Sequence, residues 1–289
     1  GQGCIGEVLA DNGGLSLQCA SEASGEPDLS GAATRLNFTN LSSTQAGGMR
    51  LASDRKGNTL AVWMESTASE SGVFARFAVS GSVAATTTVQ IDTGIESGYR
   101  PTLGFAGRGT AGMDSVAVAS LGENDFLVAW VGFHATDLTA KMFAARHHPT
   151  LGWQAPVAVT DAKAFVLRIP FGSPELFSSG DGVVALAVRA VTAESGLVWT
   201  GTAPEHVNTD WNPLDETKMT VAMYEKSVGW QTAQTVGEGC IPSVGVAISY
   251  LGYCSHPPRG VALSSGKALI LFQDRDNAGR YRLKAITFE

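Results

Sequence analysis

The sequence predicts an all-β protein made of four repeated sheets, and three observations lead to this prediction. Of the 289 residues, 34 are glycine and only 16% are charged, so long helix-forming side chains are scarce. The 44% of apolar residues is enough for a large core. An apolar strand that follows a tight polar turn recurs four times, at intervals of about 65 residues, which is the signature of a repeat architecture.

The apolar strand is the central element of each repeat, and its copies are 58–63, 125–130, 182–187 and 267–272. A shorter strand that ends in serine precedes each copy. An alternating strand follows each copy, at 73–79, 141–146, 219–225 and 281–288. A fourth, outer strand follows in three repeats, at 87–92, 156–160 and 232–236.

Four-stranded repeats favour a four-bladed β-propeller of antiparallel blades, because a radial arrangement protects sheet edges. The last repeat lacks an outer strand, and residues 33–38 alternate like one. We therefore expect this N-terminal strand to complete the last blade and close the ring. The expected blades are 47–95, 100–161, 169–237 and 242–289 with 33–40. A sandwich or jelly roll is the alternative all-β architecture.

The first repeat resembles the repeat units of bacterial β-propeller proteins, through residues 53–58 and Ala61-Val62-Trp63. The resemblance covers most of residues 33–289, which we expect to form one domain. It implies an architecture and identifies no activity. Residues 1–32 are rich in glycine, and we expect them to form an N-terminal extension rather than a fifth blade.

The four cysteines form two local pairs, Cys4 with Cys19 and Cys240 with Cys254. A disulfide in either pair would close a loop of roughly 15 residues and add on the order of 3 kcal/mol of stability. Disulfides indicate a secreted, periplasmic or cell-surface protein. Unpaired buried thiols in a cytosolic protein are one alternative, and a lipid-anchored Cys4 is another.

Charge and motifs exclude several classes of function. With 20 basic and 27 acidic residues the net charge is −7, which disfavours nucleic acid as a partner. No apolar run approaches the ~18 residues of a transmembrane segment. We find no nucleophile elbow, phosphate loop or zinc-binding helix motif. We therefore expect no metal or cofactor, although a cation in the central channel is possible, and we assign no catalytic residue.

All the long connections between the expected strands fall on one face of the propeller, at 65–72, 104–114, 189–218 and 245–260. Long connections in compact domains are often functional, so we place the site on this face. The tryptophans after the short turns, Trp153 and Trp230, are expected to be scaffold. The candidate ligand-binding residues are Trp199, Trp211, His206, Tyr250, Tyr253, Tyr99, Arg100, Arg168, Glu65 and Asp274.

This mixture of side chains suits the capture of a sugar, because aromatic rings stack on its apolar face while arginines and carboxylates bind its hydroxyls. We expect a secreted, lectin-like module that binds an extracellular glycan or small ligand, or a protein. One alternative is an extracellular glycoside hydrolase or polysaccharide lyase, which would use residues such as Glu65, Asp274, His206 and Arg168. A structural or protein-interaction domain of a surface assembly is another.

Overall fold

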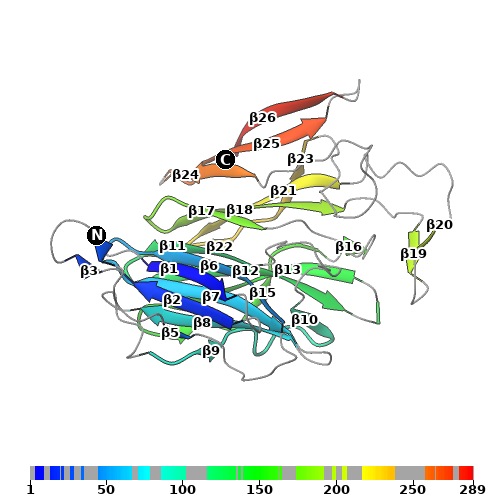
Figure 1. Cartoon of the computed structure of the whole chain (residues 1–289). Helices are drawn as coiled ribbons and strands as arrows, with labels where there is room; N and C mark the ends of the chain where they lie inside the picture. The colour runs from blue at the N-terminus through cyan, green and yellow to red at the C-terminus, as the bar shows by residue number, and fades with distance from the viewer. Residues whose placement is uncertain are drawn as a thin grey trace.

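The computed structural model describes residues 4–9, 14–19, 21–22, 27–28, 34–35, 45–66, 71–78, 86–101, 116–134, 136–137, 139–161, 163–164, 174–191, 197–199, 204–206, 217–237, 258–263, 265–275 and 280–288. These residues form strands and turns, and all of the strand pairs are antiparallel (Figure 1). No helix capable of crossing a membrane occurs in these ranges.

The four predicted repeats are four sheets, which we number 1 to 4 in chain order. Sheet 1 contains β6 (Gln45–Ser53), β7 (Thr59–Ser66), β8 (Ser71–Ala78) and β9 (Val89–Gln90). Sheet 2 contains β10 (Tyr99–Pro101), β11 (Val116–Gly122), β12 (Asp125–His134), β13 (Thr139–His148), β14 (Gly152–Trp153), β15 (Val157–Ala158) and β16 (Lys163–Ala164). Sheet 3 contains β17 (Glu175–Ser178), β18 (Val183–Val191), β21 (Thr217–Glu225), β22 (Gly229–Trp230) and β23 (Gln234–Val236), and sheet 4 contains β24 (Arg259–Ala262), β25 (Ala268–Arg275) and β26 (Tyr281–Phe288).

Consecutive sheets pack face to face, and this explains why the central strands are apolar throughout. Alternate residues of β12 bury against opposite neighbours: Val128 packs in the core shared with sheet 1, and Ala129 in the core shared with sheet 3. A third core lies between sheets 3 and 4. Trp63 and Trp130, in the central strands of sheets 1 and 2, are fully buried.

The inner strands of sheets 1 to 4, β6, β11, β17 and β24, each contact the next one along the row. Arg50 of β6 lies 3.8 Å from Glu175 of β17, and Arg55 lies 2.9 Å from Asp181. Both ion pairs join sheet 1 to sheet 3 and pass over sheet 2. Contacts that skip a sheet require the row of sheets to curve, as the blades of a propeller do.

The N-terminal residues form a further sheet, contrary to expectation. β1 (Cys4–Leu9) pairs with β2 (Gly14–Cys19), and β5 (Thr34–Arg35) joins the other edge of β2. β1 lies beside β6, so this N-terminal sheet extends the row beyond sheet 1 (Figure 1). Residues 1–32 were expected only as an N-terminal extension, and this hairpin was not predicted. The overlooked signal is Asn12-Gly13 between two alternating segments, a typical hairpin turn.

The pairing of Thr34–Arg35 does not confirm the predicted ring closure. These residues pair with Ser16 and Leu17 of β2, whereas β26 pairs only with β25 among the described strands. The described chain is thus a curved row of five sheets, and it does not confirm a closed ring of four. Two small hairpins complete the inventory, β3 (Ser21–Glu22) with β4 (Pro27–Asp28) and β19 (Leu197–Trp199) with β20 (Pro204–His206).

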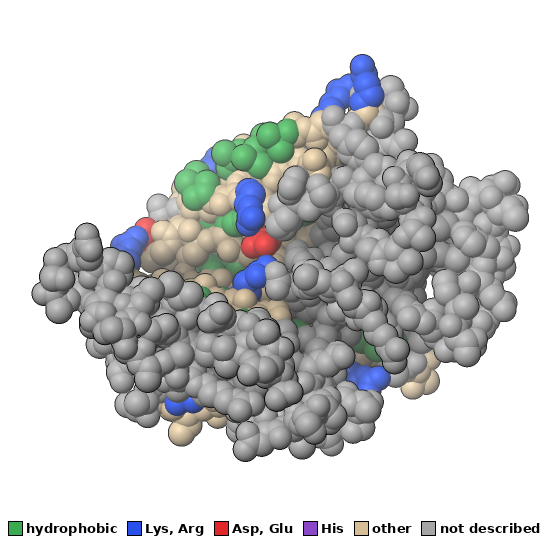
Figure 2. Space-filling view, in the orientation of Figure 1, with side chains coloured by type: hydrophobic (Ala, Val, Ile, Leu, Met, Phe, Trp, Pro, Cys, Tyr) green, Lys and Arg blue, Asp and Glu red, His purple; other side chains and the backbone are tan. Residues whose placement is uncertain are grey.

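The outer face of sheet 4 is apolar and exposed. Ala268, Ile270 and Phe272 of β25 point into the core shared with sheet 3. The opposite face carries large side chains at high exposure, from 40% for Leu269 to 74% for Leu283. Figure 2 shows a hydrophobic patch along the upper part of the molecule, where Figure 1 places this sheet.

Candidate functional site

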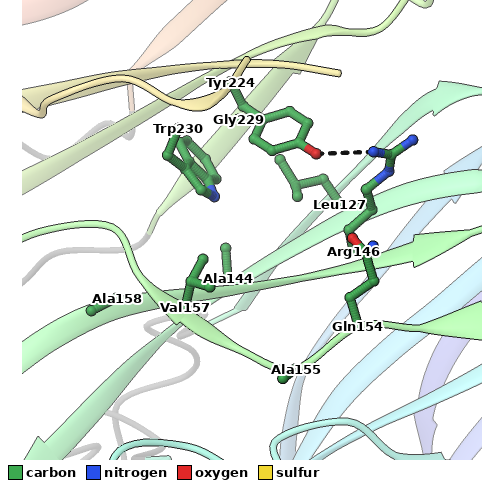
Figure 3. A pocket seen from close by; sticks show the side chains of 10 residues that line it. All are labelled: Leu127, Ala144, Arg146, Gln154, Ala155, Val157, Ala158, Tyr224, Gly229 and Trp230. Carbon is green, nitrogen blue, oxygen red and sulfur yellow. Dashed lines mark hydrogen bonds between the residues drawn. The ribbon is translucent and has the colours of Figure 1, made fainter. Parts of the chain in front are cut away.

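A pocket of about 360 Å³ lies between sheets 2 and 3, close to their short turns. Tyr224, Gly229 and Trp230 of sheet 3 line one side (Figure 3). Sheet 2 supplies the polar residues Arg146 and Gln154 and an apolar wall, which consists of Leu127, Ala144, Ala155, Val157 and Ala158. This volume is at the lower end of the range for small-molecule sites, and the combination of an aromatic wall with a few polar groups is typical of them.

The turns that precede Trp153 in sheet 2 and Trp230 in sheet 3 have the same form. It ends on a glycine with positive φ, 70° at Gly152 and 91° at Gly229, a conformation that favours glycine. Trp153 then pairs with His147 and Trp230 with Tyr224, and in both pairs the ring centroids are 5.3 Å apart. The two sheets therefore present equivalent aromatic pairs to the sheet before them.

What faces each aromatic pair differs, and this difference creates the pocket. Between sheets 1 and 2, the ring of Phe77 packs 4.5 Å from His147 and 5.6 Å from Phe126, centroid to centroid. Phe77 pairs with Leu60 in sheet 1, and Arg146 pairs with Leu127 at the equivalent place in sheet 2. The interface between sheets 2 and 3 therefore has a guanidinium where its neighbour has a phenyl ring.

Arg146 is held away from the apolar wall by a buried carboxylate. Its Nε and Nη2 donate to the two carboxylate oxygens of Asp125, at 2.9 and 2.7 Å. Lys226 of sheet 3 adds a second cation 2.8 Å from the same carboxylate, which is only 1% exposed. Burial raises the pKa of Asp125, but the bonds from Arg146 and Lys226 outweigh it and lower the pKa below its usual value.

The same arginine fixes the aromatic wall. Arg146 Nη1 donates to the hydroxyl of Tyr224 across the sheet interface at 3.2 Å (Figure 3). The tyrosine ring in turn supports the edge of Trp230, which is only partly buried. The pocket is thus assembled by bonds that do not require a ligand, and this preorganisation lowers the entropic cost of binding.

Sequence reasoning missed this pocket. It expected both Trp153 and Trp230 to be scaffold. Trp153 packs against the core between sheets 1 and 2, as predicted. Trp230 also packs against the core of its interface, as predicted, and in addition lines the pocket. The available signal was the substitution of arginine for phenylalanine at equivalent repeat positions, together with Asp125 as the first residue of the apolar strand.

The two predicted site carboxylates that the structure describes are buried and partnered. Glu65, 3% exposed, accepts a hydrogen bond from Trp63 Nε1 at 2.8 Å. Asp274, 4% exposed, lies 3.1 Å from Lys284 Nζ. They belong to sheets 1 and 4, and the structure does not bring them into the pocket.

Tyr99 and Arg100 lie in β10 at the opposite end of sheet 2 from the pocket. The Tyr99 hydroxyl is 3.0 Å from that of Thr139, and its ring packs edge-on against Phe143 and His134. Arg100 is exposed. Both residues therefore lie away from the pocket, and Tyr99 has a packing role.

Of the other predicted site residues, the structure describes Trp199 and His206. Trp199 and His206 belong to the β19–β20 hairpin, in which Trp199 is opposite Pro204 and Leu197 is opposite His206. Arg168, Trp211, Tyr250 and Tyr253 lie outside the described residues, as do Cys240 and Cys254. The register of β1 and β2 places Cys4 directly opposite Cys19, but their disulfide stays a prediction. In the described ranges, no three His, Cys, Asp or Glu residues gather where they could hold a metal ion.

No family model matches the sequence, and no curated protein matches it. Solved structures do resemble the fold. An arabinanase of Bacillus subtilis is 11% identical with a TM-score of 0.41, over 100% of this chain and 89% of that one. The polysaccharide lyase Uly1 is 9% identical with a TM-score of 0.44, over 99% of this chain and 55% of the lyase.

A lectin of Aleuria aurantia, solved with alpha-methyl-L-fucoside, is 8% identical with a TM-score of 0.40, over 100% of this chain and 77% of the lectin. These values assign neither a family nor an activity to the chain. The functional argument therefore starts from the pocket.

Proposed function

We propose that this protein is a carbohydrate-binding module and that the pocket between sheets 2 and 3 is its binding site. The observation that supports the proposal is the aromatic wall of Trp230 and Tyr224 beside Arg146 and Gln154. A sugar ring places its C–H face against an aromatic ring and its hydroxyls toward polar groups, and the pocket offers both surfaces. Its volume suits one or two sugar units.

The face with the long connections is proposed as a second contact surface, which would extend binding to a longer glycan or to a protein. Its proposed residues are Tyr99, Arg100, Arg168, Trp199, His206, Trp211, Tyr250 and Tyr253. The position of Cys4 opposite Cys19 supports a disulfide and, with it, a secreted, periplasmic or cell-surface location. The mass of the alkylated protein with and without reductant tests whether this disulfide forms.

The decisive experiment compares two tryptophans in equivalent places. We expect Trp230→Ala to weaken binding at least tenfold on a glycan array and in calorimetry, because it removes the stacking surface. Trp153→Ala removes an equivalent ring from the filled interface between sheets 1 and 2. It is expected to lower the melting temperature and to leave the affinity unchanged. Equal loss of binding in both variants would show that the pocket is not the site.

A glycoside hydrolase or polysaccharide lyase on this scaffold is the second candidate, and Glu65 and Asp274 are its proposed acids. Release of reducing ends or of unsaturated products from a polysaccharide panel tests it. Turnover that Glu65→Gln or Asp274→Asn abolishes, in a variant that keeps its melting temperature, would establish an enzyme. Turnover that survives both substitutions would exclude these two acids.

A further inference from the structure

The ion cluster at the pocket has more cations than anions. Among the described residues, Asp125 is its only carboxylate, and both Arg146 and Lys226 bind it. With all three groups ionised, the cluster carries one net positive charge. The whole chain has a net charge of −7, so this cluster differs in sign from the molecule that surrounds it.

The cluster also has hydrogen-bond donors to spare. A guanidinium has five N–H donors. Among the described residues, Arg146 uses one donor each on Nε, Nη2 and Nη1, for the two Asp125 oxygens and the Tyr224 hydroxyl. Two donors therefore remain on the two terminal nitrogens. Lys226 has three donors, is 37% exposed, and makes one described ion pair, with Asp125.

The single carboxylate is shielded from an incoming anion. Asp125 is 1% exposed, whereas the side chains of Arg146 and Lys226 are 13% and 37% exposed. A ligand in the pocket therefore meets Arg146, which lines it, before it meets Asp125, which does not. A partly desolvated arginine binds carboxylates and sulfates more strongly than it binds neutral hydroxyls, because the opposite charges attract and the anion can accept two parallel N–H bonds.

We propose that the ligand of this pocket is an acidic glycan, with its carboxylate or sulfate on Arg146 and its sugar ring on Trp230, while Lys226 offsets the charge of Asp125 behind the arginine. This inference rests on the proposed function and narrows it to a class of ligand. The interface between sheets 1 and 2 serves as an internal comparison, since Phe77 takes the place of the arginine there and fills the space.

The test uses acidic oligosaccharides and neutral counterparts with the same backbone. The probes are oligogalacturonides and their methyl esters, and chondroitin sulfate oligosaccharides and their desulfated, carboxyl-esterified forms. We expect an acidic probe to bind at least tenfold more tightly than its counterpart in 20 mM salt. We also expect the ratio to shrink in 500 mM salt, because added salt screens charge.

Lys226→Gln is expected to reduce the preference for the acidic probe severalfold and to leave the affinity for its neutral counterpart unchanged. Lys56→Gln is the control, because Lys56, like Lys226, pairs with one carboxylate and does not line the pocket, but its partner is Glu123, at 2.6 Å, rather than Asp125. Equal affinity for acidic and neutral probes would overturn this inference and leave the proposed function standing. Binding that Trp230→Ala does not change would overturn both.

Discussion

Arg146 shows how one residue alters the role of an interface. Sheet packing leaves the same space between sheets 1 and 2 as between sheets 2 and 3, and Phe77 fills the first with a ring. Arg146 cannot fill the second, because its guanidinium must stay with Asp125. A buried charge without its partner is costly, so Arg146 and Asp125 depend on each other.

Asp125→Asn is therefore expected to destabilise the protein by about 3–5 kcal/mol, since it leaves two cations without their carboxylate. Urea denaturation measures the change. Asp181→Asn removes a carboxylate from the exposed Arg55 pair and is expected to cost less than about 1 kcal/mol. Equal costs would mean that the Asp125 cluster is as weak as a surface ion pair.

His147 links stability to pH. Burial lowers its pKa, although its bond to the Asn124 carbonyl and the nearby Asp125 act in the opposite direction. The unfolded chain then binds a proton at a higher pH than the folded protein does. Stability should be full above pH 6.5 and fall as the pH drops below it, where only the unfolded histidine gains a proton.

Melting temperatures from pH 5.5 to 7.5 measure this effect. His147→Phe keeps a ring against Phe77 and Trp153 and is expected to have a flatter profile than the wild type. An unchanged slope in the variant would assign the pH dependence to other groups.

At the scale of elements, the sequence is informative about strands and weak about their partners. Long apolar runs predict the central strands because burial on both faces demands them, and all four are confirmed. The N-terminal hairpin was missed because its glycines masked a short alternation. The place of Thr34–Arg35 depends on competition between two sheet edges, which no local pattern records.

The turn 54–58 likewise shows that a local pattern predicts the turn itself but not its partners in other sheets. Its residues predict a tight turn, and Asp54 indeed accepts bonds from the backbone nitrogens of Lys56 and Asn58. Nothing local predicts that its Oδ2 also accepts the backbone N–H of Asn124 in sheet 2, at 2.8 Å. Burial raises the pKa of Asp54, but the bonds from Asn124, Asn58 and Lys56 outweigh it and lower the pKa.

Asp54→Ala should therefore loosen two turns at once. We expect a loss of about 2–3 kcal/mol, from several hydrogen bonds that each contribute about 1 kcal/mol. Faster hydrogen exchange is expected at the amide of Asn124 as well as at those of Lys56 and Asn58. Faster exchange at Lys56 and Asn58 alone would show that the bond between the sheets contributes nothing.

At the scale of the whole molecule, substitutions on the two faces of sheet 4 are expected to have opposite effects on stability: large on the buried face and small on the exposed one. Ile270 is fully buried against sheet 3, so Ile270→Ala should cost about 2–5 kcal/mol. Leu283 is 74% exposed on the other face, so Leu283→Ala should change stability by less than about 0.5 kcal/mol. Chemical denaturation of both variants measures the difference. A cost above 2 kcal/mol for Leu283→Ala would mean that this face is covered in solution.

The row of sheets follows the order of the chain, and this has a consequence for how the protein is made. Each sheet consists of strands that are neighbours in the sequence and packs on the sheet that precedes it. A chain that emerges from the ribosome N-terminus first therefore always has a folded face ready for the next sheet. The Arg55–Asp181 pair, which spans sheet 2, can form only after sheet 3 has docked. It would therefore stabilise the packed sheets 1 to 3 without guiding their docking.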